Sequence, residues 1–412
     1  MEDVYLVGAS MTPFGKFLDK SVKDLTRESV EEALADAGAT REDVGAAWFS
    51  NTTQGVIEGQ YCVPGEIALR DMGFQGIAMT NVENACASAS TAFNGAVTAI
   101  RAGVTDVALA VGVDKMYDQD KAKSFAVFEG ATDVHRQKET FERLMALGDG
   151  VTEPVDEEAA NRQRSPFMDI YACFAKQHMK MFGLTERQLA AVSSKNHQHS
   201  TQNPKSQFRF EASIDDVLAA RRISWPLTLP MCSPISDGGA AAILCSKSAL
   251  DRFDKTRAVR VLATAMGTGI DREPEDLENH ITRRTAKRAY EQAGIGPGDI
   301  DVAEVHDATA MGEITQTENL GFCAFGEGGR MAEDGETRIG GRIPINPSGG
   351  LESKGHPIGA TGLGQIYELA VQLRGEAGAR QVDGARHAIA ENGGGIYGIE
   401  EATCCITVLG RD

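Results

Sequence analysis

An internal repeat constrains the fold of this chain more than any other feature of its sequence. Residues 26–51 align with residues 282–307 without a gap. Both copies read as a helix that stops at Ala-Gly, a short turn that contains aspartate, and an apolar strand. The identical aligned pairs are Thr26/Thr282, Arg27/Arg283, Ala33/Ala289, Ala37/Ala293, Gly38/Gly294, Asp43/Asp299 and Ala47/Ala303. Amphipathic helices share small residues by chance, but chance does not explain why the helix, the turn and the strand occur in the same order and at the same spacing in both copies. The sequence therefore predicts a duplicated α/β unit.

The two copies divide the chain into three parts. At 412 residues the chain is too long for one ordinary hydrophobic core. We predict an N-terminal half over residues 1–120, which is completed by about 232–268, and a C-terminal half over residues 269–412. Residues 121–231 differ in character and are predicted to be mainly helical. The apolar run at 236–245 reads as a buried strand, and we assign it to the first half.

The central region contains an apolar helix face and a histidine pair. Helices are predicted over 138–147, 166–183 and 185–200. One face of the second helix groups large apolar side chains with a histidine, at Phe167, Tyr171, Phe174, His178 and Met181. This face has two interpretations, ordinary core packing or the lining of an acyl tunnel. His197 and His199 resemble a metal pair, but they lie in a polar run without cysteine or carboxylate support, so we predict a solvated surface there.

Charge and cysteine content exclude several classes of protein. Acidic residues outnumber basic ones by 59 to 41, and the net charge of −18 argues against a general nucleic-acid binder. No apolar run approaches the ~18 residues of a membrane span, and no signal peptide is recognisable. The eight cysteines include no CxxC pair and no metal-ligand spacing. We therefore expect a reduced, cytoplasmic protein without a metal site.

Cys86 lies where a nucleophile is expected, at the start of a predicted helix. It belongs to the stretch 84–90, and apolar residues follow it at helical spacing. The helix dipole and the unpaired amide N–H groups at such a position favour the thiolate, which is the nucleophilic form of cysteine. The alternative is a small buried residue, because free cysteine is among the most buried residue types.

Three segments of the second half could assist this cysteine. His306 follows a predicted strand over 300–305, at the carboxyl end where α/β sites usually form. His356 lies in a glycine-rich loop over 346–362 that leads into a helix. Residues 390–398 read as another glycine-rich loop that could turn backbone amides toward an anion. A thiol, two imidazoles and such loops are the minimal set for acyl transfer, because an imidazole activates the thiol while amide and imidazole donors stabilise the oxyanion.

These segments resemble the motifs of the thiolase superfamily. Within it they are most similar to the sterol-carrier type, which is often labelled lipid-transfer protein or acetyl-CoA acetyltransferase. Asn-Ala-Cys-Ala-Ser around Cys86 is similar to the nucleophile motif of the family. The runs at 233–242, 306–307 and 346–350 resemble its other motifs, and Gly-His-Pro-Ile-Gly-Ala-Thr-Gly at 355–362 is the most specific match. The resemblance spans nearly the whole chain.

The resemblance implies a fold and a set of residue roles. The thiolase fold is α/β, with two duplicated βαβαβ-type halves in a five-layered α-β-α-β-α sandwich and a helical loop domain over the active site. Cys86 would accept the acyl group, His356 would activate it, and His306 would complete the first oxyanion hole with His356. The backbone amides of Cys86 and Gly393 would form the second oxyanion hole. Ser233 would contact the pantetheine arm of the substrate.

Two departures from the family pattern leave the second acid/base open. Glu391 replaces the cysteine of the usual Cys-x-Gly motif, and Ala308 replaces the cysteine that follows His-Asp in the sterol-carrier type. We expect Glu391 to be the base, because partial desolvation raises a carboxyl pKa toward values suited to proton transfer. The alternative is a structural Glu391, and Glu313 is a second carboxylate candidate. Cys404 and Cys405 lie in an apolar strand and are expected in the core.

The resemblance implies an acyltransferase that acts on coenzyme A thioesters through an acyl-Cys86 intermediate. The reaction would be thiolysis of a 3-oxoacyl-CoA or the reverse Claisen condensation, with coenzyme A as substrate or product and no covalently bound cofactor. One alternative is a retro-aldolase of steroid side-chain degradation with a small zinc-ribbon/OB-type partner, against which Cys86 counts. Another is a non-enzymatic acyl-CoA or lipid-binding protein, which the missing second base favours. We expect a homodimer or a dimer of dimers.

Overall fold

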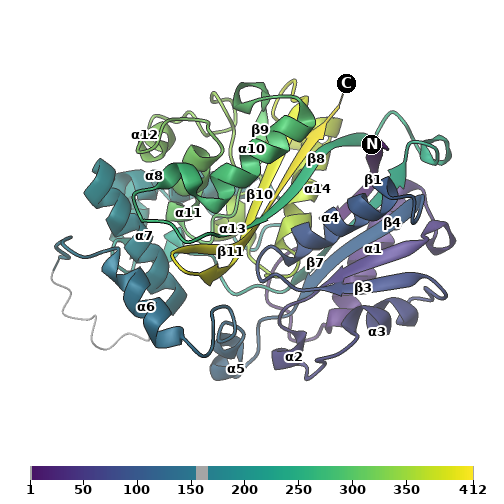
Figure 1. Cartoon of the computed structure of the whole chain (residues 1–412), viewed down its shortest axis with the longest axis horizontal. Helices are drawn as coiled ribbons and strands as arrows, with labels where there is room; N and C mark the ends of the chain where they lie inside the picture. The colour runs from purple at the N-terminus through teal and green to yellow at the C-terminus, as the bar shows by residue number, and fades with distance from the viewer. Residues whose placement is uncertain (1, 155–165, 412) are drawn as a thin grey trace.

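A nine-stranded mixed sheet runs through both halves of the chain, in the order β3-β2-β4-β7-β1-β8-β11-β10-β9. The structure is a computed structural model that describes residues 2–154 and 166–411 (Figure 1). The strands are β1 (Val4–Met11), β2 (Ala46–Ser50), β3 (Ala78–Val82), β4 (Val107–Asp114), β7 (Gly238–Ser246), β8 (Val259–Thr268), β9 (Val302–Glu304), β10 (His387–Tyr397) and β11 (Glu400–Gly410). β1 and β8 share only two residue pairs, so the halves meet at a short seam.

The strand order of the second half mirrors that of the first. From the seam outward, each half has two antiparallel pairings followed by a parallel one: β1–β7–β4–β2 in the first half and β8–β11–β10–β9 in the second. The predicted completion of the first half by 232–268 is therefore corrected, because β8 pairs along its length with β11 and belongs to the second half. The first half then adds β3, parallel to β2. In the second half a parallel bridge between Ala303 and Ile345 takes that place. The topology is therefore that of a duplicated unit.

The aligned repeats fold alike in detail. α1 (Val22–Ala37) and α10 (Ile281–Ala293) end at Gly38 and Gly294, both with positive φ, as the left-handed end of a helix requires. A short 3₁₀ turn follows each helix, η1 (Arg41–Asp43) and η6 (Pro297–Asp299). In each turn the aspartate carboxylate accepts the backbone N–H three residues earlier, at 2.8 Å. Local residue chemistry thus reproduces the same turn twice.

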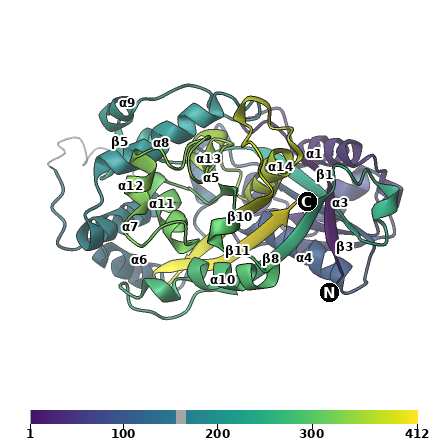
Figure 2. The ribbon, with the colours of Figure 1, turned by 90° about the horizontal axis from the view of Figure 1, so that it is seen from above.

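Helices cover the sheet in layers (Figure 2). α4 (Ser88–Arg101) and α14 (Thr361–Arg374) pack against each other in the middle and share one hydrophobic core with strands of both halves. α1 and α3 (Pro64–Asp71) cover the outer face of the first half. α10 covers the outer face of the second half against β8 and β11. The result is a five-layered α-β-α-β-α arrangement in which the two inner helices begin close together.

The region between β4 and β7 is helical, as the sequence predicts, and lies on one side of the molecule (Figure 1). Its elements are α5 (Lys121–Ala126), α6 (Gln137–Ala146), α7 (Pro166–Phe182), α8 (Glu186–Ser200), α9 (Ile214–Ala219) and the hairpin of β5 (Arg222–Ser224) and β6 (Leu227–Thr228). The predicted helices at 138–147, 166–183 and 185–200 are confirmed to within one residue at each end. These helices pack on α11 (Ala310–Asn319), α12 (Gly328–Glu333) and α13 (Gly350–Lys354) of the second half.

The predicted solvated surface at His197 and His199 is wrong. Both side chains are buried, with 1% and 4% of their surface exposed. The ring of His197 stacks on Phe210, with ring centroids 4.8 Å apart, and Nδ1 of His199 lies 3.0 Å from the carbonyl oxygen of Asn346. α8 is polar in sequence yet buried, because its polar groups bond to residues of the second half far along the chain.

The predicted loop at 390–398 is also corrected, because most of it belongs to β10. Gly398 does lie in a turn, between β10 and β11, with a φ of +71°, but Gly394 serves close packing. A Cβ on Gly394 would lie 2.3 Å from the carbonyl oxygen of Asn84 and 2.6 Å from the backbone nitrogen of Ala87. Glycine at this position therefore lets the strand approach the turn that carries Cys86.

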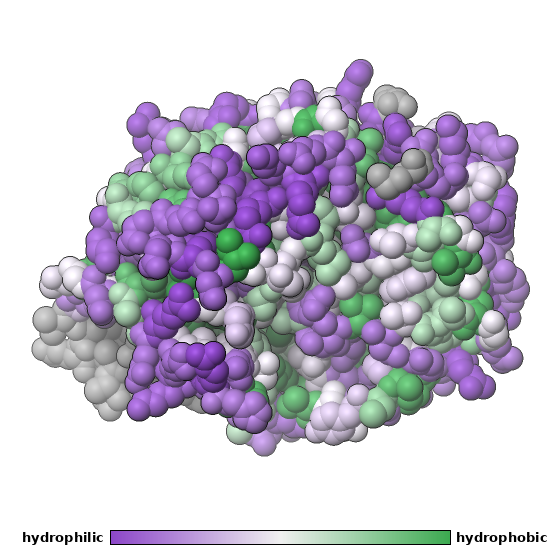
Figure 3. Space-filling model, viewed as in Figure 1, coloured by the Kyte–Doolittle hydropathy of each residue, from purple (hydrophilic) through white to green (hydrophobic). Residues whose placement is uncertain are grey.

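The surface of one face is uneven in polarity (Figure 3). Hydrophilic residues gather over α10, whereas paler, less polar residues lie over β3 and the neighbouring segment before α3. Exposed large hydrophobic residues include Tyr61 and Val63 in that segment and Ile67 in α3. None of the helices in the described residues has the length and apolar character needed to cross a membrane.

Candidate active site

A tight turn between β3 and α4 presents Cys86. Ala85, the residue before it, has a φ of +48°, which residues with a side chain rarely adopt. The Ser88 hydroxyl accepts the backbone N–H of Asn84 at 2.7 Å and donates to the carbonyl oxygen of Ala85 at 2.6 Å. The N–H of Ala87 donates to the carbonyl of Asn84 at 3.0 Å. These bonds hold the turn in a strained conformation, a feature common at functional sites.

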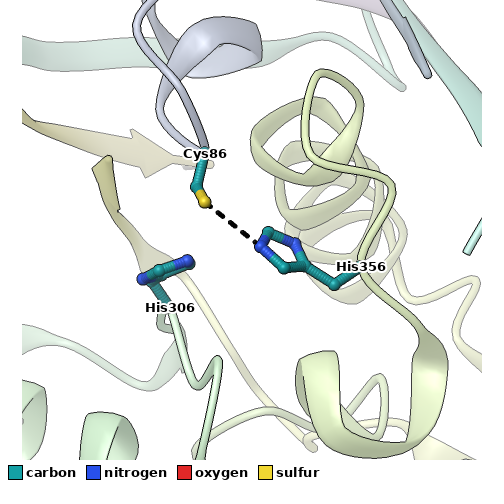
Figure 4. Close-up of side chains that lie close together, drawn as sticks. All are labelled: Cys86, His306 and His356. Atoms are coloured by element: carbon teal, nitrogen blue, oxygen red, sulfur yellow. Dashed lines mark hydrogen bonds between the residues drawn. The ribbon is translucent and has the colours of Figure 1, made fainter. Parts of the chain in front are cut away.

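His356 faces the thiol across the junction of the two halves. Its Nε2 lies 3.3 Å from Sγ of Cys86 (Figure 4). Its Nδ1 lies 2.6 Å from Oγ1 of Thr361, and that hydroxyl donates to the carbonyl oxygen of Pro357 at 3.0 Å. Because the hydroxyl proton is engaged, Thr361 accepts Nδ1–H of His356. Nε2 is therefore left with a lone pair that can accept the proton of the Cys86 thiol.

His306 completes a cluster of three side chains. It follows β9, and its ring centroid lies 5.3 Å from that of His356, nearly edge to face (Figure 4). The thiol sulfur and one nitrogen of each imidazole all lie within 4.8 Å of one another. Both ring nitrogens of His306 are buried and have no hydrogen-bond partner among the described residues. Since buried polar atoms nearly always have a partner, this ring is suited to bind an oxygen of a substrate.

A cavity of about 870 Å³ opens onto these three side chains. Of the residues predicted for the site, Cys86, His306, His356 and Ser233 line it. Ala308 lines it too, at the position where the sterol-carrier type has a cysteine. The lining also includes Met116, Phe128, Phe167, Tyr171, Ile235, Met266, Ile358, Gly394, Gly395 and Glu401. A largely apolar cavity with a few convergent polar groups is typical of a small-molecule site.

The surroundings of Cys86 oppose ionisation. Burial, with the carboxylates of Asp114 and Glu401 nearby, raises the pKa of the thiol to about 12. The sequence predicts a thiolate favoured by the helix start, and the structure corrects this, because desolvation outweighs that effect. Burial also lowers the pKa of His306 to about 4 and that of His356 well below its usual value. At neutral pH a neutral thiol therefore faces a neutral imidazole that can take its proton.

The carboxylates predicted for the site lie outside the cavity lining. Oε2 of Glu391 accepts the backbone N–H of His306 at 2.9 Å, and its Oε1 lies 3.8 Å from Sγ of Cys404. Glu313 forms a buried ion pair with Lys195, at 2.8 Å. Gly393 is likewise absent from the cavity lining, where Gly394 and Gly395 stand. Cys404 and its neighbour Cys405 are buried in the core, as predicted.

Glu401 is the carboxylate that sequence reasoning missed. It lies near the start of β11 and lines the cavity, although it is 92% covered, with 8% of its surface exposed. In sequence it stands in a Glu-Glu pair before an apolar strand, which reads as a solvated strand end. No local signal distinguishes it, because its position in the site depends on the pairing of β11 with β10.

The apolar face of α7 contributes both to the core and to the walls of two cavities. Tyr171 and Phe174 belong to a hydrophobic core cluster. Phe167 and Tyr171 also line the main cavity. A smaller cavity of about 80 Å³ lies beside it and is lined in part by Phe174, His178 and Met181. Tyr171 and Glu401 line both cavities and so form part of the wall between them.

The fold is a duplicated, five-layered α/β sandwich, and a Cys–His pair lies where its two inner helices begin. These two features together define the thiolase class of protein. The chain belongs to the thiolase family. The family model for the thiolase N-terminal domain matches residues 4–216, and the model for the thiolase C-terminal domain-like region matches residues 265–410. The fold predicted from the resemblance is confirmed.

Several relatives match nearly the whole chain. The acetyl-CoA acetyltransferase of Methanothermobacter thermautotrophicus is 38% identical, over 97% of this chain and 98% of that protein. Sterol carrier protein 2 of Homo sapiens is 37% identical, over 94% of this chain and 69% of that protein. A benzoylsuccinyl-CoA thiolase subunit of Thauera aromatica is 32% identical, over 92% of this chain and 91% of that protein.

Solved structures share the fold at lower sequence identity. The Ltp2-ChsH2(DUF35) aldolase superposes with a TM-score of 0.76 at 23% identity, covering 100% of this chain and 98% of that chain. Human mitochondrial 3-ketoacyl-CoA thiolase superposes with a TM-score of 0.68 at 16% identity, covering 99% of this chain and 98% of that chain. At these identities the likeness establishes the fold and leaves the reaction to be argued from the site.

Proposed function

We propose that this protein is an acyltransferase of the thiolase type, which acts on coenzyme A thioesters through an acyl-Cys86 intermediate. The observation that carries the proposal is the 3.3 Å contact between Sγ of Cys86 and Nε2 of His356. Thr361 fixes the imidazole so that Nε2 can accept the thiol proton. The acetyl-CoA acetyltransferase and the benzoylsuccinyl-CoA thiolase subunit among the relatives support a coenzyme A thioester as the substrate.

In the first half-reaction His356 removes the thiol proton, and the sulfur of Cys86 attacks the C3 carbonyl of a 3-oxoacyl-CoA. The C2–C3 bond breaks, its electron pair goes to C2, and C2 then takes a proton to give the shorter coenzyme A thioester. The rings of His306 and His356 stabilise the developing charge on the thioester oxygen. The backbone amide of Cys86 stabilises the oxyanion formed at C3. The second donor that the family pattern assigns to this oxyanion is the backbone amide of Gly393, whose neighbour Gly394 lines the cavity.

In the second half-reaction coenzyme A gives up its thiol proton, and its sulfur attacks the acyl-Cys86 carbonyl. The bond to Cys86 breaks, and the cysteine sulfur recovers its proton from His356. The same steps in reverse make a 3-oxoacyl-CoA by condensation. Ser233 lines the cavity and contacts the pantetheine arm in this proposal. Its backbone N–H donates to the carbonyl of Ala308 at 3.0 Å, which ties the Ser233 loop to the segment after His306.

Two further parts of the proposal concern assembly and compartment. β3 lies at the edge of the sheet and carries exposed residues along most of its length. An open sheet edge pairs readily with another chain, which supports a homodimer joined along β3. All eight cysteines are free thiols, which supports a reducing, cytoplasmic compartment.

The test is thiolysis of 3-oxoacyl-CoAs of several chain lengths by the wild type, Cys86→Ala and the matched control Cys62→Ala, whose cysteine is exposed. We expect Cys86→Ala to lose at least about 10³-fold in kcat, as removal of a nucleophile does, and Cys62→Ala to match the wild type. Acyl-CoA binding without turnover by the wild type would contradict the proposal and favour the non-enzymatic alternative. Retro-aldol cleavage that survives in Cys86→Ala would favour the aldolase.

A further inference from the structure

Glu401 is a buried carboxylate in the cavity wall, and it has no role in the reaction steps proposed above. It lines the cavity together with Cys86. One carboxylate oxygen accepts the side-chain N–H of Gln316 at 3.3 Å, and the other lies 3.8 Å from Nε2 of His280. Its stem packs on Gly393, where an added Cβ would lie 2.7 Å from Cγ of Glu401. Glycine at 393 therefore makes room for this side chain.

Other carboxylates near the site are bonded to other groups or exposed to solvent. Oε2 of Glu391 holds the backbone N–H of His306. Glu400 lines the smaller cavity but not the one that holds Cys86, and it pairs with the buried guanidinium of Arg272 at 2.6 Å. Glu83 also lines the cavity, but it is exposed to solvent, and its Oε1 accepts the backbone N–H of Ala85 at 2.6 Å. Among the described residues, Glu401 is therefore the buried carboxylate of the cavity wall.

We propose that Glu401 is the second acid and base of the reaction, the function for which the sequence favours Glu391. This inference rests on the proposed function. As the acid form, Glu401 gives its proton to C2 when the C2–C3 bond breaks. As the carboxylate, it then takes the thiol proton of coenzyme A before the sulfur attacks acyl-Cys86. One proton leaves and one returns per turnover, so Glu401 is regenerated without any other reactant.

The surroundings of Glu401 suit both steps. Burial and, less strongly, the nearby Glu400 raise its pKa, a backbone hydrogen bond and Arg272 oppose the rise, and the net pKa is about 7. His280 faces Glu401 as well, and its own pKa is lowered to about 3, so it is neutral and leaves the carboxylate without a cationic partner. Both protonation states of Glu401 are therefore populated at neutral pH, which is the condition for efficient proton transfer in either direction.

The test separates proton transfer at C2 from acylation of Cys86. The first readout is exchange of the C2 protons of acetyl-CoA for deuterium in deuterated water. The second is acylation of Cys86 by p-nitrophenyl acetate, whose leaving group departs without a proton. In Glu401→Gln we expect exchange and thiolysis to fall at least about 10²-fold, while acylation stays within about twofold of the wild type. Glu401→Asp keeps an acid and should recover part of the exchange.

Glu391→Gln is the matched control, a buried glutamate on the paired strand. Because it holds the backbone of His306, it should slow both readouts together. Exchange and thiolysis at wild-type rates in Glu401→Gln would overturn the proposal for Glu401, as would an equal loss of both readouts in that variant. A wild-type enzyme whose Cys86 accepts no acyl group would overturn the proposed function itself, which is a different outcome.

Discussion

Oγ1 of Thr361 lies 2.6 Å from Nδ1 of His356 while its own proton goes to the carbonyl oxygen of Pro357. This relationship sets the tautomer of the imidazole, and with it the direction in which the Cys86 proton can move. Thr361 is also the first residue of α14. The start of the inner helix of the second half thus prepares the base for a nucleophile at the start of the inner helix of the first.

Replacing Thr361 tests this relationship. In Thr361→Val the hydroxyl acceptor is lost while the shape is kept, so His356 no longer holds its proton on Nδ1. We expect the rate of Cys86 acylation to fall about 10²-fold, measured as the burst of nitrophenolate from p-nitrophenyl acetate. Thr361→Ser keeps the hydroxyl and should stay within about threefold of the wild type. Equal rates in the valine and serine variants would show that the hydroxyl does not set the tautomer.

A methyl group at Gly394 should displace the nucleophile. An added Cβ would lie 2.3 Å from the carbonyl oxygen of Asn84, so the turn that carries Cys86 has to move. For Gly394→Ala we expect a loss of about 1–3 kcal/mol of unfolding free energy and at least tenfold slower acylation. The control Gly298→Ala meets no atom within 4 Å and should change stability by less than about 0.5 kcal/mol. Normal acylation in Gly394→Ala would contradict the packing argument.

The pKa of Glu401 should be visible as a pH dependence of stability. Burial raises this pKa from 4.5 to about 7, so between these values the folded state binds more protons than the unfolded state. Stability therefore falls as pH rises through this window, by up to about 3 kcal/mol at ~1.4 kcal/mol per pKa unit. The side chain that replaces it in Glu401→Gln cannot ionise, so this variant does not lose stability for this reason.

Urea unfolding at pH 5 and pH 8 measures the effect. The unfolding free energy of Glu401→Gln relative to the wild type should increase between these values. Other titrating groups are common to both proteins and cancel in the comparison. A difference that stays constant with pH, or decreases, would mean that Glu401 keeps an ordinary pKa in the folded protein.

The buried ion pair of Lys195 and Glu313 should matter for stability. The two side chains are fully covered, Nζ and Oε1 lie 2.8 Å apart, and Lys195 also donates to the carbonyl oxygen of Ile345 at 2.6 Å. Lys195→Met leaves the carboxylate of Glu313 buried without its cation, so we expect a loss of about 3–5 kcal/mol in denaturant unfolding. Lys138→Met, on the exposed α6, should cost at most about 1 kcal/mol. Similar losses of unfolding free energy in both variants would contradict the stabilising role of the Lys195–Glu313 ion pair.

Features set by neighbouring residues could be predicted from the sequence. The duplicated unit is one example, because Gly38 and Gly294 end their helices and Asp43 and Asp299 close their turns with bonds to residues three positions away. The helix lengths of the central region are another. The grouping of Cys86 with His306 and His356 follows from their places at a helix start, after a strand and in a glycine-rich loop, together with the motif resemblance, and the structure brings these residues together.

Features set by distant partners could not be predicted. α8 reads as a polar surface helix, but Lys195 on it is neutralised by Glu313, 118 residues further along the chain. The glycine-rich part of β10 reads as a loop because glycine usually weakens strands. Position 394 needs a glycine, however, because a Cβ there would clash with the carbonyl oxygen of Asn84, more than three hundred residues earlier. Glu401 reads as a solvated strand end, and only strand pairing and the packing of the second half place it in the cavity.

The most direct test of the account is whether Cys86 carries the acyl group during turnover. The wild type is mixed rapidly with a short 3-oxoacyl-CoA in the absence of free coenzyme A, and the intact mass and the peptide map are recorded within one turnover. The account predicts a mass increase of one acyl group located on Cys86, slower formation in His356→Asn and no such adduct in Cys86→Ala. It would be contradicted by turnover without any adduct on the wild-type enzyme, or by an acyl group on another residue that persists in Cys86→Ala.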